Sequence, residues 1–412
     1  MPFGRAAKEL EHFTSVEVSE ATVRRITEGA GAEYVAVQNE EVEEIFEQAP
    51  ESPAGPELQL ISADGAMVHE TSGEWVEVRT VAIGEVEPKG ADGEVHTREL
   101  SYFSRLSTAS EFTMQALVEV FRRGTEKARR VCSVNDGADW EQKFIDYHRP
   151  DAVRILDFAH AAGKVAEAGR LILGEETPEF KQWFSKQKQA LKLGKTEAVL
   201  RRIRRLENGV RGRGRRRKIG IIRGSASYLE KRREMIKYNE FQDKGYPIGS
   251  GCVESANKLV VESRLKQAGM RWARRNIDSM LGLRNIACND RWLEAWPQLV
   301  THRLKAMTKT HKDQPIIGLA EQASLTASPV TSEPVPASLL LSTQRNAQKY
   351  RTKESSKTPY KPAADHPWRR KQFGSARYRT PVGFTARNHD AHPLRFSAFR
   401  SAKPLSAKSE RL

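Results

Sequence analysis

The chain has 412 residues, a formal net charge of +15 and an isoelectric point near 9.7. This length allows two or three structural units, and the positive charge indicates a polyanionic partner. Three widely spaced cysteines without a CxxC pair exclude a disulfide framework and a zinc finger, and they are typical of a reducing cytosol. No apolar run approaches the roughly 18 residues of a membrane span, and no secretory leader is recognisable. We therefore expect a cytoplasmic protein without a membrane partner.

The chain opens with a predicted pair of helices. Ser19 is the expected N-cap of the second helix, because apolar residues at helical spacing follow it. With a shorter helix at residues 6–13, this segment would form a helix-turn-helix that exposes Arg24 and Arg25 to DNA. An ordinary helical hairpin explains the same pattern, and the acidic residues around it disfavour contact with DNA.

The next part of the chain predicts a mixed α/β sheet. Its elements follow the order of three strands, helix, strand, helix and strand, which is the order of the ribonuclease-H-like fold. The first and fourth strands each end in Asp-Gly, at Asp64 and Asp136. Because sites in such sheets lie off the carboxyl ends of strands, we expect the two acids to share a site. The predicted strands span residues 58–65, 75–84, 95–106, 130–137 and 152–156, with helices at 110–123 and 140–147.

Residues 177–246 break this rhythm and predict a helical insertion with a high density of arginine. Arg213, Arg215 and Arg216 lie in a glycine-rich stretch that we expect to be a flexible basic loop. Such a segment is suited to follow a phosphate backbone. The alternative is a solvated amphipathic hairpin.

A turn rich in Pro and Gly then leads into a helix with Glu254 in its first turn. A carboxylate at this position could hold a metal ion beside a phosphate. On these residues alone, a carboxylate that complements the helix dipole and pairs with Lys258 is the favoured interpretation. The other cations of this stretch are candidate phosphate contacts, although a solvated helix face explains them as well: Arg264, Lys266 and Arg271.

These motifs, taken together, resemble bacterial insertion-sequence transposases of the Kra-type group, which is similar to the wider Mutator superfamily. The resemblance covers nearly all of residues 1–300, and its longest motif surrounds Glu254. The matching segments are DGAMV at 64–68 with WVEVR at 75–79, DGADW at 136–140, Asp157-x-x-His160 and GSGCVESANKLVVESRLKQAGMRW at 249–272. Residues 19–31 and 366–370 also resemble that group.

The resemblance implies a ribonuclease-H-like core with a DDE catalytic triad, interrupted by a helical insertion before the glutamate. Asp64 and Asp136 match the two aspartates, and Glu254 matches the glutamate. Asp157 and His160 match an accessory Cys/Asp-x-x-His pair, in which His160 has either a structural role or a role in metal or strand positioning. Asp139 is the alternative to Asp136, and Glu262 the alternative to Glu254.

Transfer of a phosphodiester requires charge neutralisation on the attacking and leaving oxygens, which two Mg²⁺ or Mn²⁺ ions can provide. We expect Asp64 to bridge both ions, Asp136 to bind one and Glu254 the other. The expected partners are the terminal inverted repeats of the element, the target DNA and a second copy of the chain in a homodimer or higher oligomer. In the cell the protein would associate with the nucleoid.

Two other functions stay open at this point. One is a metal-dependent nuclease that cuts without joining, and the other is a catalytically silent DNA-binding protein derived from a transposase. The predicted organisation is a helix-turn-helix-like region (1–47), a linker (48–57), a first core part (58–176), the insertion (177–246), a second core part (247–300) and a disordered basic tail (301–412).

Overall fold

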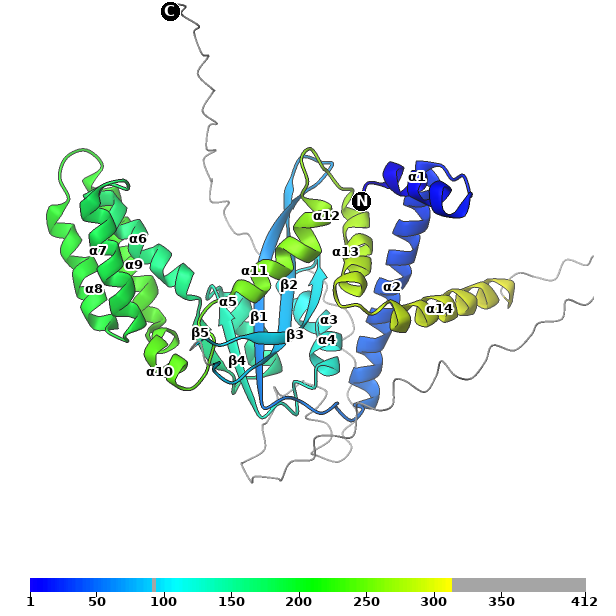
Figure 1. The fold of residues 1–412 in the computed structure, drawn as a ribbon, viewed down its shortest axis with the longest axis horizontal. Helices are drawn as coiled ribbons and strands as arrows, with labels where there is room; N and C mark the ends of the chain where they lie inside the picture. The colour runs from blue at the N-terminus through cyan, green and yellow to red at the C-terminus, as the bar shows by residue number, and fades with distance from the viewer. Residues whose placement is uncertain (91–93, 313–412) are drawn as a thin grey trace, which may run out of the picture. The chain divides into compact units, whose positions relative to one another are not determined.

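The computed structural model describes residues 1–90 and 94–312, and these form a five-stranded mixed sheet with helices around it (Figure 1). The strand order is β3-β2-β1-β4-β5, with antiparallel pairs β1–β2 and β2–β3 and parallel pairs β1–β4 and β4–β5. The predicted α/β fold with a ribonuclease-H-like sheet is therefore confirmed. The strands are β1 Leu58–His69, β2 Trp75–Val86, β3 Thr97–Arg105, β4 Arg130–Asn135 and β5 Val153–Leu156.

The first strand is longer than predicted, and Asp64 lies inside it. The strand β1 stays paired with β2 as far as His69, opposite Trp75. Beyond Asp64, Ala66 and Val68 are buried against the helix that carries Glu254, and this cover stabilises the extra length. Only the first part of β1 is paired with β4, up to Ile61. Asp64 therefore lies where β1 has separated from its parallel neighbour.

Alternating side chains of the sheet enter different cores. Leu60 belongs to the core shared with the insertion, whereas Ile61 packs with Phe112 and Phe144. This alternation follows from the two-residue period of a strand. The helices of the second core are α3 Ala109–Gln115, α4 Leu117–Arg122 and α5 Asp139–His148. The single helix predicted at residues 110–123 is thus two helices, separated at Ala116.

The N-terminal helices are α1 Phe3–Thr14 and α2 Glu20–Gln48. Ser19 caps α2 as predicted, since its hydroxyl accepts a hydrogen bond of 3.1 Å from the Thr22 N–H. The length of α2 was not predicted: buried Tyr34 and Ile45 continue its inner face, and it packs along α13 Arg274–Cys288. A 29-residue packed helix suits a helical hairpin better than a short DNA-reading helix.

The insertion consists of helices that pack on one another and on α6 Phe158–Leu173 (Figure 1). Its elements are α7 Pro178–Lys192, α8 Thr196–Arg205, η1 Leu206–Gly209, α9 Arg215–Lys231, η2 Arg233–Ile236 and α10 Tyr238–Asp243. The helix predicted across residues 190–206 is divided at Gly194, which has a positive φ of 71°. Arg215 and Arg216 begin α9, so they belong to a helix and not to the predicted loop.

The last part of the described chain, from Gly251 to Lys312, is helical. Its elements are α11 Gly251–Ala256, the π-helical turn η3 Asn257–Glu262, α12 Ser263–Leu265, α13 and α14 Trp292–Lys312. The prediction of a disordered tail from residue 301 is wrong for residues 301–312, because they belong to α14. This helix contains Pro297 and continues past it to Lys312. The rest of that tail, with residues 366–370, lies outside the described residues. Among the helices of residues 1–90 and 94–312, none combines the length with the apolar composition of a membrane-spanning segment.

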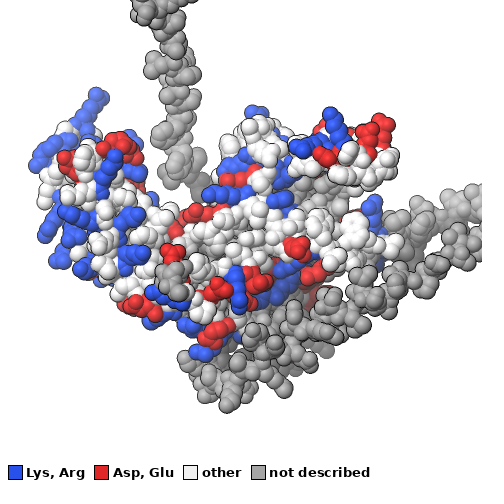
Figure 2. All heavy atoms as spheres, in the orientation of Figure 1, with Lys and Arg blue, Asp and Glu red and all other residues white. Residues whose placement is uncertain are grey.

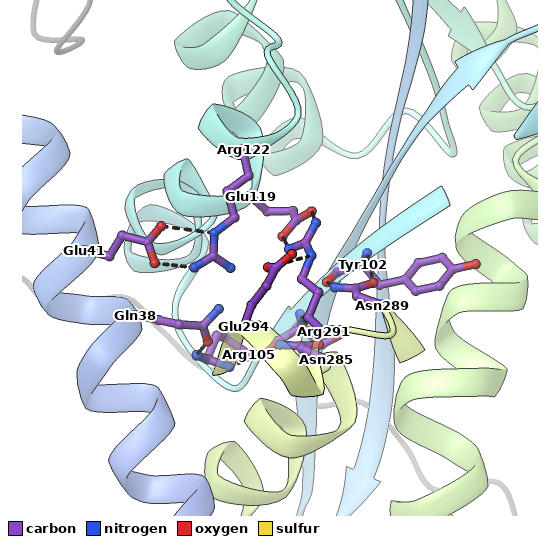
Figure 3. A network of polar contacts seen from close by, with 11 residues as sticks. Gln38, Glu41, Tyr102, Arg105, Glu119, Arg122, Asn285, Asn289, Arg291 and Glu294 are labelled. Atoms are coloured by element: carbon purple, nitrogen blue, oxygen red, sulfur yellow. Dashed lines mark hydrogen bonds and ion pairs between the residues drawn. The ribbon is translucent and has the colours of Figure 1, made fainter. Parts of the chain in front are cut away.

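A buried polar network joins α2 and α4 to the segment between α13 and α14 (Figure 3). Arg291 forms two hydrogen bonds of 2.6 and 2.8 Å with the Glu119 carboxylate, which is 1% exposed. Burial alone would raise the pKa of Glu119, but Arg291, with smaller contributions from Arg122 and Ser101, leaves that pKa below its ordinary value. Arg122 likewise donates two hydrogen bonds to the carboxylate of Glu41 in α2: Nε donates to Oε1 at 3.0 Å, and a terminal guanidinium nitrogen donates to Oε2.

Candidate catalytic site

Three aspartates lie just beyond the points where the parallel strand pairs end. The last pair of β1 with β4 is Ile61 with Ser133, and the last pair of β4 with β5 is Asn135 with Leu156. Asp64 follows three residues after Ile61, whereas Asp136 and Asp157 come directly after β4 and β5. The three acids therefore lie at the carboxyl ends of the parallel pairings.

Asp64 is half-buried and accepts two short hydrogen bonds. Its Oδ1 accepts from the Gly65 N–H at 2.7 Å, and its Oδ2 accepts from Asn257 Nδ2 at 2.8 Å. Burial raises the pKa of Asp64, and the charges of Asp136 and Glu254 add to that effect. These two predicted partners are therefore close enough to act on Asp64 electrostatically.

Asp136 follows β4 in a turn that the insertion holds in place. Its Oδ1 accepts a 2.8 Å hydrogen bond from the Ala138 N–H. The hydroxyl of Tyr228 in α9 donates to the Asp136 carbonyl oxygen, and Arg232 donates to the Gly137 carbonyl oxygen at 2.5 Å. The Arg232 guanidinium also lies 3.9 Å from the centre of the Tyr228 ring. The insertion thus supports the second aspartate directly.

Glu141 is a buried acid beside Asp136 that the sequence analysis missed, and it does not line the cavity described below. It is 1% exposed, and its Oε2 accepts hydrogen bonds from the N–H groups of Gly137 (3.0 Å) and Ala138 (3.1 Å). Burial and the neighbouring Asp136 raise the pKa of Glu141 to about 10. Its position in the first turn of α5 is one that caps a helix, so the sequence pattern gave no separate signal. Asp139, the predicted alternative to Asp136, is exposed in the same turn.

Glu254 lies in the first turn of α11, as predicted, and is exposed. Val253 and Ala256 on either side of it are buried against β1 and β2, and they fix the helix over the sheet. One carboxylate oxygen of Glu254 lies 3.5 Å from the Ser250 hydroxyl. Glu262, the predicted alternative, pairs with Lys266 at 2.9 Å.

The three predicted catalytic acids line one cavity of about 460 Å³. Its walls also contain the accessory pair and one face of α6, and the full lining is Ala63, Asp64, Asp136, Asp157, Ala159, His160, Gly163, Lys164, Glu167, Ser250, Val253 and Glu254. Among the described residues, no three His, Cys, Asp or Glu side chains lie close enough together to hold a metal ion. The acids therefore face a common space without forming a closed ligand set.

The accessory pair connects α6 to the turn before Glu254. Asp157 is 4% exposed; its Oδ2 accepts from the His160 backbone N–H at 2.7 Å, and its Oδ1 accepts from the Ser250 N–H at 2.9 Å. Asp157 is thus both the N-cap of α6 and an anchor for α11. The His160 ring does not make this contact; it lines the cavity, 5.9 Å from the Tyr228 ring centre.

The predicted DNA-binding residues are exposed with one exception. Arg264 is 8% exposed and lies between two aromatic rings, 4.7 Å from the Phe3 ring centre and 4.8 Å from that of Trp272. Its prediction as a phosphate contact is therefore wrong for this conformation, because aromatic neighbours enclose the guanidinium. Figure 2 shows Lys and Arg gathered over the insertion. The exposed candidates are Arg24, Arg25, Arg213, Arg215, Arg216, Lys258, Lys266 and Arg271.

Comparison with known proteins adds little to this geometry. No family model matches the chain, and no curated protein matches it. Among solved structures, it is similar to a chain described as "Drosophila P element transposase strand transfer complex", at 12% identity and a TM-score of 0.31. The match covers 71% of this chain and 89% of that one. A likeness at this score does not assign a function.

Proposed function

We propose that the chain is the transposase of a bacterial insertion sequence, which cleaves DNA strands and joins them to a target. The observation that supports this proposal best is the common cavity. Asp64, Asp136 and Glu254 come from three distant parts of the sequence, and all three line it on a ribonuclease-H-like sheet. Carboxylates gathered in this way on a basic protein suit the cutting of a polyanion.

The side chains of the cavity fit Mg²⁺ or Mn²⁺, which prefer oxygen ligands. The acids supply carboxylate oxygens, and the neighbouring Asn257 adds a buried amide oxygen that has no hydrogen-bond partner among the residues that the structure describes. A pair of such ions would neutralise charge on the reacting phosphate and activate water. We infer that Glu254 turns from Ser250 toward Asp64 on binding, because a 3.5 Å contact is too long to hold it firmly.

We further propose that the insertion binds the phosphate backbone at a point about 20 Å along α9 from Tyr228. Arg213, Arg215 and Arg216 are exposed at the start of α9, and α9 also holds the turn of Asp136 through Tyr228. DNA bound by α9 would therefore lie on an element that is bonded to the catalytic turn. The terminal repeats of the element and the target would be the DNA partners, and joining two element ends calls for at least a dimer.

The decisive experiment incubates the protein and a labelled oligonucleotide containing an element end with plasmid DNA and Mg²⁺ or Mn²⁺. We expect cleavage and joining by the wild type, and loss of both in Asp64→Ala, Asp136→Ala and Glu254→Ala with DNA affinity nearly unchanged. Glu262→Ala is the matched control, since it removes a partly exposed carboxylate that pairs with Lys266 farther along the same helical segment. It should keep activity, and a loss of activity in this variant would assign the glutamate of the triad to Glu262 instead. Cleavage without joining would indicate a nuclease, and neither activity would indicate a DNA-binding protein.

A further inference from the structure

Asn257 occupies an unusual place beside the proposed metal site. It follows α11 directly and is 6% exposed, and its Nδ2 donates the 2.8 Å hydrogen bond to Asp64 Oδ2. The amide must face Asp64 with its nitrogen, because a carboxylate oxygen accepts hydrogen bonds and would repel the carbonyl oxygen. The orientation of the Asn257 side chain is therefore fixed by chemistry as well as by packing.

The other end of this amide lacks a partner. Asn257 Oδ1 is buried and accepts no hydrogen bond from any described residue. Buried carbonyl oxygens are nearly always paired, so one without a partner, on an amide that is bonded to Asp64, indicates that a ligand or water completes the site. The Asp64 carboxylate cannot supply the missing hydrogen, because an ionised carboxylate only accepts.

The backbone holds Asn257 there through a π-helical turn, a rare element that occurs often at functional sites. The wide turn is supported from α13, where Arg284 donates to the carbonyl oxygen of Val260 at 3.4 Å and to that of Leu259. Arg284 also donates to the Ser263 hydroxyl at 3.2 Å. An arginine thus satisfies carbonyl groups that a regular α-helix would bond internally.

We propose that Asn257 is a positioning residue of the metal site. Its Nδ2 orients the Asp64 carboxylate, and its Oδ1 accepts a hydrogen bond from a water molecule on the bound ion. Mg²⁺ retains several of its waters in proteins, so a nearby acceptor is a suitable partner for them. This inference rests on the proposed metal-dependent function.

The test measures Mn²⁺ binding to the full chain without DNA, by titration, for wild type and Asn257→Leu. Loss of such an outer partner weakens metal affinity about 10–100-fold, and we expect a loss in that range. Gln187→Leu is the matched control: Gln187 is 2% exposed in α7, and its amide bonds to the Trp183 carbonyl oxygen and to Arg202, away from the cavity. Its replacement should leave Mn²⁺ affinity unchanged.

Asn257→Asp is a second variant that keeps the shape of the side chain. The extra negative charge beside Asp64 should lower the melting temperature without metal and enlarge its rise on addition of Mn²⁺. A merely structural Asn257 would lower the melting temperature equally with and without metal. Wild-type affinity for Mn²⁺ in Asn257→Leu, or an unenlarged rise in Asn257→Asp, overturns the role of Asn257 alone. A wild-type protein that binds no Mn²⁺ overturns the metal-dependent function and this role together.

Discussion

The contact between α2 and α13 can be tested by replacing Gly31 with alanine. A Cβ on Gly31 would lie 2.0 Å from the Ser279 carbonyl oxygen and 2.9 Å from the Ser279 Cα. Both atoms belong to the backbone of α13, so only movement of a whole helix can relieve the clash. Overpacking of this kind costs about 1–3 kcal/mol, and an overlap with backbone belongs at the upper end of that range.

The higher helix propensity of alanine stabilises the folded state by about 1 kcal/mol relative to glycine and offsets part of this cost. We therefore expect Gly31→Ala to lower the free energy of unfolding by about 2 kcal/mol. Gly29→Ala is the matched control, because a Cβ at Gly29 in the same helix would meet nothing within 4 Å. It should raise stability by about 0.5–1 kcal/mol. Urea denaturation followed by circular dichroism measures both. Equal stability of the two variants would refute the close approach of the helices.

Three further predictions concern charged groups. Glu141→Gln should stabilise the metal-free protein at neutral pH, because Gln retains the hydrogen bonds of the protonated acid to the neighbouring turn. Because the pKa of Glu141 is raised in the folded state, its contribution to the free energy of unfolding is complete below about pH 4.5 and is lost as the pH rises toward about 10. The difference in free energy of unfolding between Glu141→Gln and the wild type, measured by denaturant titration, should therefore grow over that pH range. Arg291→Met leaves the Glu119 carboxylate buried without its main partner and should cost about 3–5 kcal/mol, whereas a melting temperature equal to wild type would show that Arg122 neutralises it alone. The last prediction replaces the exposed Arg213, Arg215 and Arg216 together. The variant should bind duplex DNA of any sequence more weakly, and the slope of log K against log salt should become shallower by about 0.9 for each lost phosphate contact. An unchanged slope would exclude the three arginines from the interface.

The sheet and the general position of the acids were predictable because they depend on local patterns. Alternating apolar residues define the strands, and the cap at Ser19 follows from a single side chain. Asp136 comes directly after β4, so its place at the carboxyl end of that strand follows from the strand pattern. These features need little information from distant parts of the chain.

The features that were not predicted depend on contacts between distant segments. Past Asp64, β1 is paired with β2 and its residues Ala66 and Val68 are buried against segments far along the chain, among them α11. The sequence around Arg264 predicts an exposed cation, whereas in the structure Phe3 and Trp272 enclose its guanidinium. A π-helical turn has no distinctive composition, so the orientation of the side chain at its start could not be inferred from spacing.

The helix α13 links the N-terminal region to the proposed catalytic helix. Gly31 of α2 meets α13 at Ser279, and Arg284, farther along α13, bonds to the π-helical turn that begins at Asn257. Because a packed helix moves as a unit, a shift of α13 that relieves a clash at Gly31 also displaces Arg284. Gly31→Ala should therefore weaken Mn²⁺ binding, whereas Gly29→Ala should not. Equal affinities in the two variants would mean that the sheet alone, through buried residues such as Val260, holds the turn in place.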